Sequence, residues 1–102
     1  MSRPLIEAFL IDDLNETKII AHGLSIRQII QVLENRHAVI PNRKQRRGIY
    51  LVIGRDNGGS CISIPVEPTH EFSVWRPITA WRCKKNEQTL LKNVERYSEQ
   101  EL

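Results

Sequence analysis

The feature that most constrains the fold is a pair of β-rich segments joined by a tight turn. GIYLVIG (48–54) and SCISIPVE (60–67) are rich in β-branched and apolar residues, and RDNGG (55–59) between them contains the residues that hairpin turns prefer. HAVI (37–40) predicts a short strand before them, and VWRPITAW (74–81) predicts another after them. Successive strands joined by polar loops are typical of an antiparallel meander.

Two prolines restrict the later strands of this meander. Pro65 lies within residues 60–67, and Pro77 lies within residues 74–81. Because proline has no backbone N–H to donate to a ladder, both residues are expected at a sheet edge or at a bulge.

The N-terminal part of the chain predicts a strand and then a helix. PLIEAFLID (4–12) is short and apolar, as a first strand would be. DLNE (13–16) has the spacing of a capping box, with Asp13 at the N-cap and Glu16 three residues later. The helix that begins there is expected to end at Gly23, since glycine suits the left-handed conformation that follows many helices.

The second helix has the strongest local signal. Ser25 and Gln28 form another capping box, and the apolar residues that follow recur at the 3.6-residue period of a buried face. These apolar residues are Ile26, Ile29, Ile30 and Leu33. KNEQTLLKNVERYSEQ (85–100) predicts a terminal helix. A strand, two helices, an antiparallel meander and a helix indicate an α+β fold, in one domain over residues 1–102.

The two-helix unit at residues 15–35 also has the look of a DNA-reading helix-turn-helix. Two features favour simple core packing instead. Ile19, four residues before Gly23, is branched and large where that motif has a small residue, and the second helix carries a single cation, Arg27. DNA reading by this unit is therefore the less favoured interpretation.

Composition limits the class of protein further. No apolar run approaches membrane-spanning length and no secretory signal pattern is present, so a soluble, cytoplasmic protein without a membrane partner is expected. Cys61 and Cys83 are the only cysteines, and no Cys/His spacing indicates zinc. We expect two reduced structural thiols and no metal or cofactor.

The positive charge is concentrated in the middle of the chain. The formal net charge is +3, but residues 36–85 hold ten of the fifteen cations and only three of the twelve anions. Such a field is the usual footprint of a polyanion, with an acidic protein partner or a solubility role as the alternatives. A nucleic acid or nucleoprotein is the favoured partner.

The densest charge lies in PNRKQRRG (41–48), whose cations we call the basic cluster: Arg43, Lys44, Arg46 and Arg47. Because this segment joins two predicted strands, it is a solvated hairpin loop, a localisation signal or part of a nucleic-acid surface. Together with Arg55, Arg76 and Arg82 of the same meander, the basic cluster would extend one RNA-binding face across the sheet.

Aromatic and histidine side chains supply the other candidates. Tyr50, Trp75 and Trp81 could stack on unpaired bases or could equally belong to the core. His22, His37 and His70 could exchange protons near neutral pH. A histidine at a helix end, as His22 is, more often caps carbonyl groups, and the other two fit exposed positions.

Taken together, three segments resemble BrnT-type toxins. AHGLSIRQIIQVLEN (21–35) resembles the KHGVS...EVF segment of that family. GIYLVIGRDNGG (48–59) is similar to its RYIAIG hairpin, and WRPITAWRCKKNEQ (75–88) is similar to its RIISARxAtxxE strand and helix start. The resemblance spans roughly residues 13–90.

That family belongs to the RelE/ParE-like superfamily of small toxins. The resemblance therefore implies a two-helix unit packed against an antiparallel sheet. It also implies metal-independent cleavage of RNA, free or on the ribosome, that inhibits translation and is restrained by a cognate antitoxin. The implied assembly is a toxin–antitoxin hetero-oligomer or a homodimer. Such cleavage needs a general base for the ribose 2′-hydroxyl and cations for the charge on phosphate.

Matched position by position, the resemblance assigns the catalytic roles to His22, Arg76, Thr79 and Glu87. Two matched positions depart from the family, because Ala21 replaces a lysine and Trp81 replaces an arginine. Arg76 also has a structural alternative, a salt bridge to Glu67 or to Glu87. The alternative function is a non-enzymatic module that binds nucleic acid or protein on the same fold.

Overall fold

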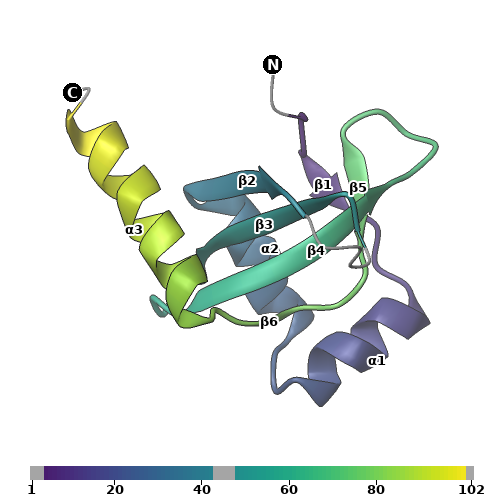
Figure 1. Cartoon of the computed structure of the whole chain (residues 1–102). Helices are drawn as coiled ribbons and strands as arrows, with labels where there is room; N and C mark the ends of the chain where they lie inside the picture. The colour runs from purple at the N-terminus through teal and green to yellow at the C-terminus, as the bar shows by residue number, and fades with distance from the viewer. Residues whose placement is uncertain (1–3, 43–47, 101–102) are drawn as a thin grey trace.

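The computed structural model of the chain describes residues 4–42 and 48–100, and within them three helices and a mixed six-stranded sheet form an α+β fold (Figure 1). The predicted α+β class is therefore confirmed. In chain order the elements are β1 (Ala8–Phe9), α1 (Asp13–Ala21), α2 (Ile26–Glu34), β2 (His37–Pro41), β3 (Tyr50–Arg55), β4 (Cys61–Pro68), β5 (Val74–Pro77), β6 (Trp81–Arg82) and α3 (Lys85–Gln100).

The sheet has the strand order β1-β5-β4-β3-β2, and β6 pairs with β4 beyond the end of β5. The successive pairs β2–β3, β3–β4 and β4–β5 are antiparallel, which confirms the predicted meander. The N-terminal strand is shorter than the expected 4–12, because only Ala8 and Phe9 pair, in parallel, with β5.

The strand expected at 74–81 is wrong as a continuous element, and Pro65 explains why. Pro65 lies in β4, a central strand that pairs with β5 through residues 66–68 and with β6 through residues 62–63. The neighbouring chain leaves the ladder opposite Pro65, and only Ile78 N–H, at 2.9 Å, donates to the Pro65 carbonyl. Since Pro65 has no N–H, the interruption falls where the ladder cannot continue, as a proline inside a sheet requires.

The start of α1 corrects the predicted capping box by one residue. Asp12 is the N-cap, and its side chain accepts from Asn15 N–H at 2.9 Å while Asp12 N–H donates to Asn15 Oδ1 at 2.9 Å. Asp13 and Glu16 instead lie in the exposed first turn. Asn15 is fully buried, and its amide donates to the carbonyl oxygens of Leu10 and Pro77, both at 2.9 Å. These tertiary bonds select the register.

The end of α1 and the start of α2 follow the prediction. Gly23 adopts the left-handed conformation, with φ of 76°, directly after the C-cap residue His22. Ser25 and Gln28 form the expected capping box of α2. The buried face of α2 is rotated from the predicted one, since Val32 is buried beside Ile29 whereas Ile30 is exposed.

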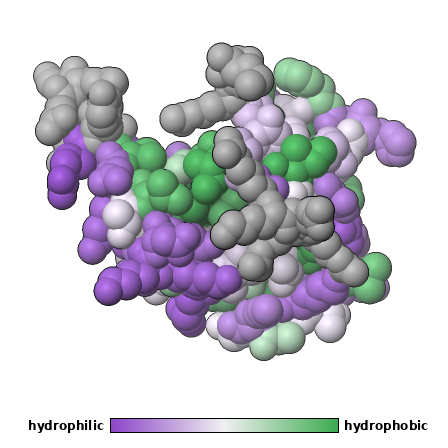
Figure 2. All heavy atoms as spheres, in the orientation of Figure 1, coloured by the Kyte–Doolittle hydropathy of each residue, from purple (hydrophilic) through white to green (hydrophobic). Residues whose placement is uncertain are grey.

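Two apolar clusters lie on opposite faces of the sheet. Alternate residues of β3 divide between them, with Val52 facing α2 and with Leu51 and Ile53 facing α3. Figure 1 shows α3 at the end of the sheet away from β1, where Leu91 is its buried apolar contact. Figure 2 shows apolar side chains between α3 and the β2–β3 part of the sheet, so α3 covers its face only in part.

Cys61 and Cys83 form a disulfide, with their Cα atoms 5.3 Å apart. The expectation of two free thiols is therefore wrong. The two residues are far apart in sequence, but β6 pairs antiparallel with β4, which brings residue 83 beside residue 61. Cys83 N–H also donates to the Cys61 carbonyl at 2.9 Å.

Candidate functional site

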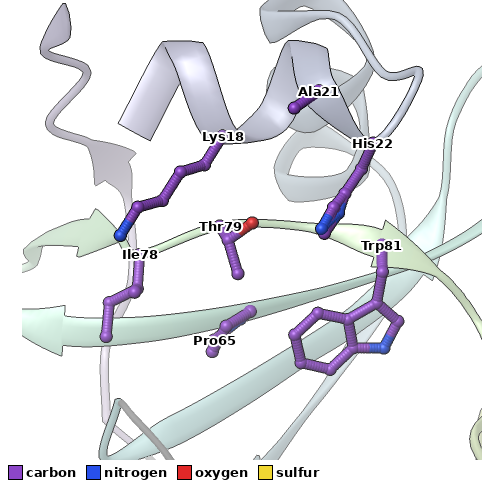
Figure 3. Close-up of a pocket in the computed structure, with 7 residues that line it drawn as sticks. All are labelled: Lys18, Ala21, His22, Pro65, Ile78, Thr79 and Trp81. Atoms are coloured by element: carbon purple, nitrogen blue, oxygen red, sulfur yellow. The ribbon is translucent and has the colours of Figure 1, made fainter. Parts of the chain in front are cut away.

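A pocket of about 420 Å³ lies between α1 and the segment that joins β5 to β6. Its lining residues are Lys18, Ala21, His22, Pro65, Ile78, Thr79 and Trp81. Figure 3 shows the side chains of Lys18 and His22 descending from α1 toward the segment that carries Thr79, with the Trp81 ring below. A volume of this size is within the range of small-ligand sites, which begins near about 300 Å³.

The upper wall of the pocket follows from helical spacing. Lys18 and His22 are four residues apart, so they lie one above the other on the same face at the end of α1. Both are exposed. Figure 3 shows the Lys18 ammonium on the Ile78 side of the pocket and the His22 imidazole on the Trp81 side, with Thr79 between them.

The lower wall follows from the interruption opposite Pro65. Because the chain leaves the ladder between β5 and β6, Ile78 and Thr79 lie over Pro65 rather than in the sheet. The same proline that breaks the predicted strand thus forms part of the pocket floor. Thr79, half-buried, adds the hydroxyl group of this wall.

Trp81 forms one side of the pocket, and Glu87 of α3 fixes its position. Its indole Nε1–H donates to the Glu87 carboxylate, at 3.1 Å to Oε1 and 3.4 Å to Oε2. The Lys84 ammonium lies 5.7 Å from the ring centroid, within the range of a cation–π contact. Trp81 is half-buried, so part of its ring remains accessible to the pocket.

Glu87 is buried behind the tryptophan and does not line the pocket. Besides Trp81, it accepts a hydrogen bond from the backbone N–H of Lys84 at 2.7 Å, which satisfies a free donor at the start of α3. The predicted catalytic glutamate therefore anchors the pocket wall and the helix.

Arg76 connects β5 to two carboxylates. Its Nε and Nη2 donate to Asp12, at 2.7 and 3.1 Å, and its Nη1 donates to Glu67 at 3.0 Å. The salt-bridge alternative to Glu67 is thus confirmed, whereas the one to Glu87 is not present. Hydrogen bonds from Arg76, and then from Asn15 N–H, lower the pKa of Asp12, and the pKa of Arg76 is raised chiefly by its bond to Asp12.

Arg76 lies beside the pocket rather than in it. It lines an adjacent hollow of about 370 Å³ that shares Lys18 and Ile78 with the pocket. Together with the amide of Asn15 on Pro77, the Arg76–Asp12 pair fixes the start of α1 to the end of β5. This attachment fixes the position of α1 and therefore the positions of Lys18 and His22 in the pocket wall.

Neither Arg55 nor Arg82, two predicted RNA-binding cations that the structure describes, lines this pocket. Arg55 forms a salt bridge with Glu95 at 2.9 Å and donates to the Gly59 carbonyl. Arg82 is exposed on β6, next to Trp81 and therefore on the other face of that strand. The basic cluster lies outside the described residues.

The remaining aromatic and histidine candidates lie elsewhere. The rings of Tyr50 and Trp75 meet edge to face, with their centroids 5.5 Å apart, beside the apolar cluster on the α2 face of the sheet. The Trp75 indole N–H donates to the Leu5 carbonyl. A ring nitrogen of His37 bonds the Asn35 carbonyl at 2.8 Å, and His70 lines a separate hollow near the β4–β5 loop. His22 is the histidine of the pocket.

Lys18 is the residue that sequence reasoning missed. It lines the pocket one helical turn before His22. The signal was its four-residue spacing to His22 on a predicted helix.

In the part of the chain that the structure describes, no group of three or more His, Cys, Asp or Glu side chains is arranged to hold a metal ion. Among the described helices, none is both long and apolar enough to cross a membrane. No protein-family model, curated protein or solved structure matches this chain.

Proposed function

We propose that the pocket binds a segment of unpaired RNA and cleaves it by metal-independent transesterification, as a ribonuclease toxin that inhibits translation in the cytoplasm and is restrained by an antitoxin. The observation that carries the proposal is the pocket itself. An imidazole, an ammonium, a hydroxyl and an accessible aromatic ring line one hollow: His22, Lys18, Thr79 and Trp81.

The imidazole of His22 is the proposed general base. It would take the proton of a ribose 2′-hydroxyl, whose oxygen then attacks the adjacent phosphorus and displaces the 5′-oxygen of the next nucleotide. The products are a 2′,3′-cyclic phosphate and a 5′-hydroxyl, with the leaving oxygen protonated by water or by the imidazolium formed in the first step. His22 is exposed at the end of α1, so a long RNA strand can reach its imidazole.

Lys18 is the proposed partner of the phosphate. Its ammonium, one turn before His22, would stabilise the negative charge that grows on the phosphate oxygens as the new bond forms. Thr79 on the opposite wall can donate its hydroxyl to the same phosphate or to the ribose.

Trp81 is the proposed base platform. Bases stack on aromatic rings with little dependence on sequence, so one half-buried indole can hold an unpaired nucleotide beside the catalytic groups. Glu87 acts through this ring by accepting its N–H, and Arg76 acts through α1 by binding Asp12. Both are positioning residues in this proposal, in place of the catalytic roles that the resemblance implies.

A specific observation favours the second candidate, a non-enzymatic RNA-binding module. The arginine and the glutamate that the resemblance makes catalytic are both occupied by protein contacts. A pocket with one imidazole and one ammonium could bind RNA without turning it over. The two candidates differ in whether His22 is needed for a chemical step.

Cleavage and binding of an unpaired RNA oligonucleotide, with and without ribosomes, separate the candidates. For the toxin, His22→Ala lowers the cleavage rate by about 10²- to 10⁴-fold with little change in affinity, as loss of a general base does. His70→Ala, at an exposed histidine away from the pocket, is the matched control and keeps full activity. Binding without cleavage by the unaltered protein selects the module, and no binding in either assay refutes both. Growth arrest on expression of the chain alone is the expected cellular outcome.

A further inference from the structure

The disulfide lies next to the proposed site. Cys83 follows Trp81 by two residues and precedes Glu87, the acceptor of the Trp81 N–H, by four. The amide of Gln88 also donates to the Cys83 carbonyl at 3.2 Å. The covalent link from Cys83 to Cys61 therefore ties to β4 the short segment that carries the tryptophan and its anchor.

The rest of α3 gives this segment little other support. Between Lys85 and Arg96, the described side chains that are buried are Glu87 and Leu91. Leu91, one turn beyond Glu87, packs in the apolar cluster on the α3 face of the sheet, with Leu51 and Ile53. Besides Leu91 and the polar contacts of Glu87, Gln88 and Glu95, the disulfide is the covalent attachment of the segment before α3 to the sheet.

Ser63 supplies an independent observation at the disulfide. Its side chain is fully buried, and its hydroxyl donates to the Cys83 sulfur at 3.4 Å. A buried hydroxyl aimed at that sulfur would stabilise the thiolate that leaves when the bond is broken. Cys61 is the more exposed residue of the pair, so its sulfur is the one that we assign to attack by a reductant.

We infer that the Cys61–Cys83 disulfide is a redox-sensitive clasp that holds Trp81 in the pocket wall and that a dithiol reductant opens. Its effect on RNA rests on the proposed function. A thiolate of the dithiol attacks the Cys61 sulfur, Cys83 leaves as a thiolate, and the second thiol of the reductant then displaces Cys61. Two electrons and two protons pass to the cysteines, which become thiols, and the dithiol becomes a disulfide. In the cytosol, disulfides are chiefly transient and regulatory, which agrees with such a role.

The test uses the whole chain labelled with 5-fluorotryptophan, which gives one ¹⁹F resonance for Trp81 and one for Trp75. Dithiothreitol is added until a thiol assay finds two free thiols per chain. The Trp81 resonance is expected to shift or broaden while that of Trp75, in the other core cluster, stays in place. The affinity for an RNA oligonucleotide is expected to fall about tenfold, within the worth of one base stack.

The Cys61→Ser/Cys83→Ser double variant is expected to show the reduced spectrum and no response to dithiothreitol. If that variant fails to fold, the titration of the unaltered protein carries the test. An unchanged Trp81 resonance in fully reduced protein would overturn the clasp, and so would a joint loss of both resonances and of far-UV circular dichroism, since this would be global unfolding. Absence of RNA binding in both redox states would refute the proposed function, while the Trp81 resonance still decides the clasp.

Discussion

Asn15→Ala should destabilise the protein more than any exposed change in α1. Asn15 is fully buried and, together with the Arg76–Asp12 pair, attaches the start of α1 to β5. Its side chain accepts from Asp12 N–H and donates to the carbonyl oxygens of Leu10 and Pro77, each at 2.9 Å. Alanine removes all three bonds and leaves the Pro77 carbonyl in a buried place without its donor.

The size of the effect follows from these three bonds. At about 1 kcal/mol for each hydrogen bond, the free energy of unfolding should fall by about 3 kcal/mol. For a domain of this length each kcal/mol lowers Tm by about 4–8 °C, so Tm should fall by about 12 °C or more.

Urea denaturation and thermal melts of Asn15→Ala are compared with Glu16→Ala. Glu16 is the residue that the sequence alone selects for the capping box, but in the structure it lies exposed in the first turn. Glu16→Ala should therefore change the free energy of unfolding by no more than about 0.5 kcal/mol, as is usual at exposed sites. Equal losses in the two variants, or a larger loss in Glu16→Ala, would refute the argument that tertiary contacts of Asn15 set the helix start.

Three further predictions concern charge. Arg76→Lys should lower Tm and leave cleavage proportional to the folded fraction, whereas a loss of about 10²-fold or more at unchanged Tm would place the guanidinium on the phosphate. The bond from Arg76 lowers the pKa of Asp12 in the folded state. The contribution of this ion pair to stability is therefore complete above the unfolded pKa of about 4, and it is lost as the pH falls through the lower folded pKa. Urea denaturation at a series of pH values from about 2 to about 6 should show this loss of unfolding free energy, and the loss should be smaller in Arg76→Met. Replacing the basic cluster by alanines should weaken RNA binding and reduce the slope of log affinity against log salt by up to about 3; an unchanged slope would make the cluster a solubility device.

Local sequence signals predicted the parts of the fold that depend on near neighbours. The Ser25–Gln28 capping box, the left-handed Gly23 and the hairpin around residues 55–59 depend on residues a few positions apart, and each is present as expected. The break opposite Pro65 was anticipated only as an edge or bulge, because which strand lies beside a proline depends on the pairing of the whole sheet.

Long-range contacts account for the expectations that failed. The spacing of Asp13 and Glu16 satisfies a capping box as well as that of Asp12 and Asn15 does. Contacts from β5 distinguish them, through the Pro77 carbonyl on Asn15 and the Arg76 guanidinium on Asp12. The pairing of Cys61 with Cys83 likewise depends on β6 returning beside β4. None of these contacts can be predicted from a short stretch of sequence, because each joins residues that are far apart in the chain.

The candidate site was predictable in part. His22 and Thr79 were matched by resemblance, and the structure brings both to the pocket. Glu87 and Arg76 were matched equally well, but their roles depend on which partners fold against them, a tryptophan and two carboxylates. Similar motifs therefore locate side chains better than they define what those side chains contact.

The most direct test of the proposed function is the chemistry of the RNA ends. Mass spectrometry of the products should find 2′,3′-cyclic phosphate and 5′-hydroxyl termini, and a substrate with 2′-deoxyribose at the cleaved nucleotide should resist cleavage there while still binding. His22→Ala should lose these products and keep its fold. Cleavage of the 2′-deoxy substrate, 5′-phosphate termini, or no cleavage of RNA either free or on ribosomes would contradict the proposal that His22 activates a 2′-hydroxyl in this pocket.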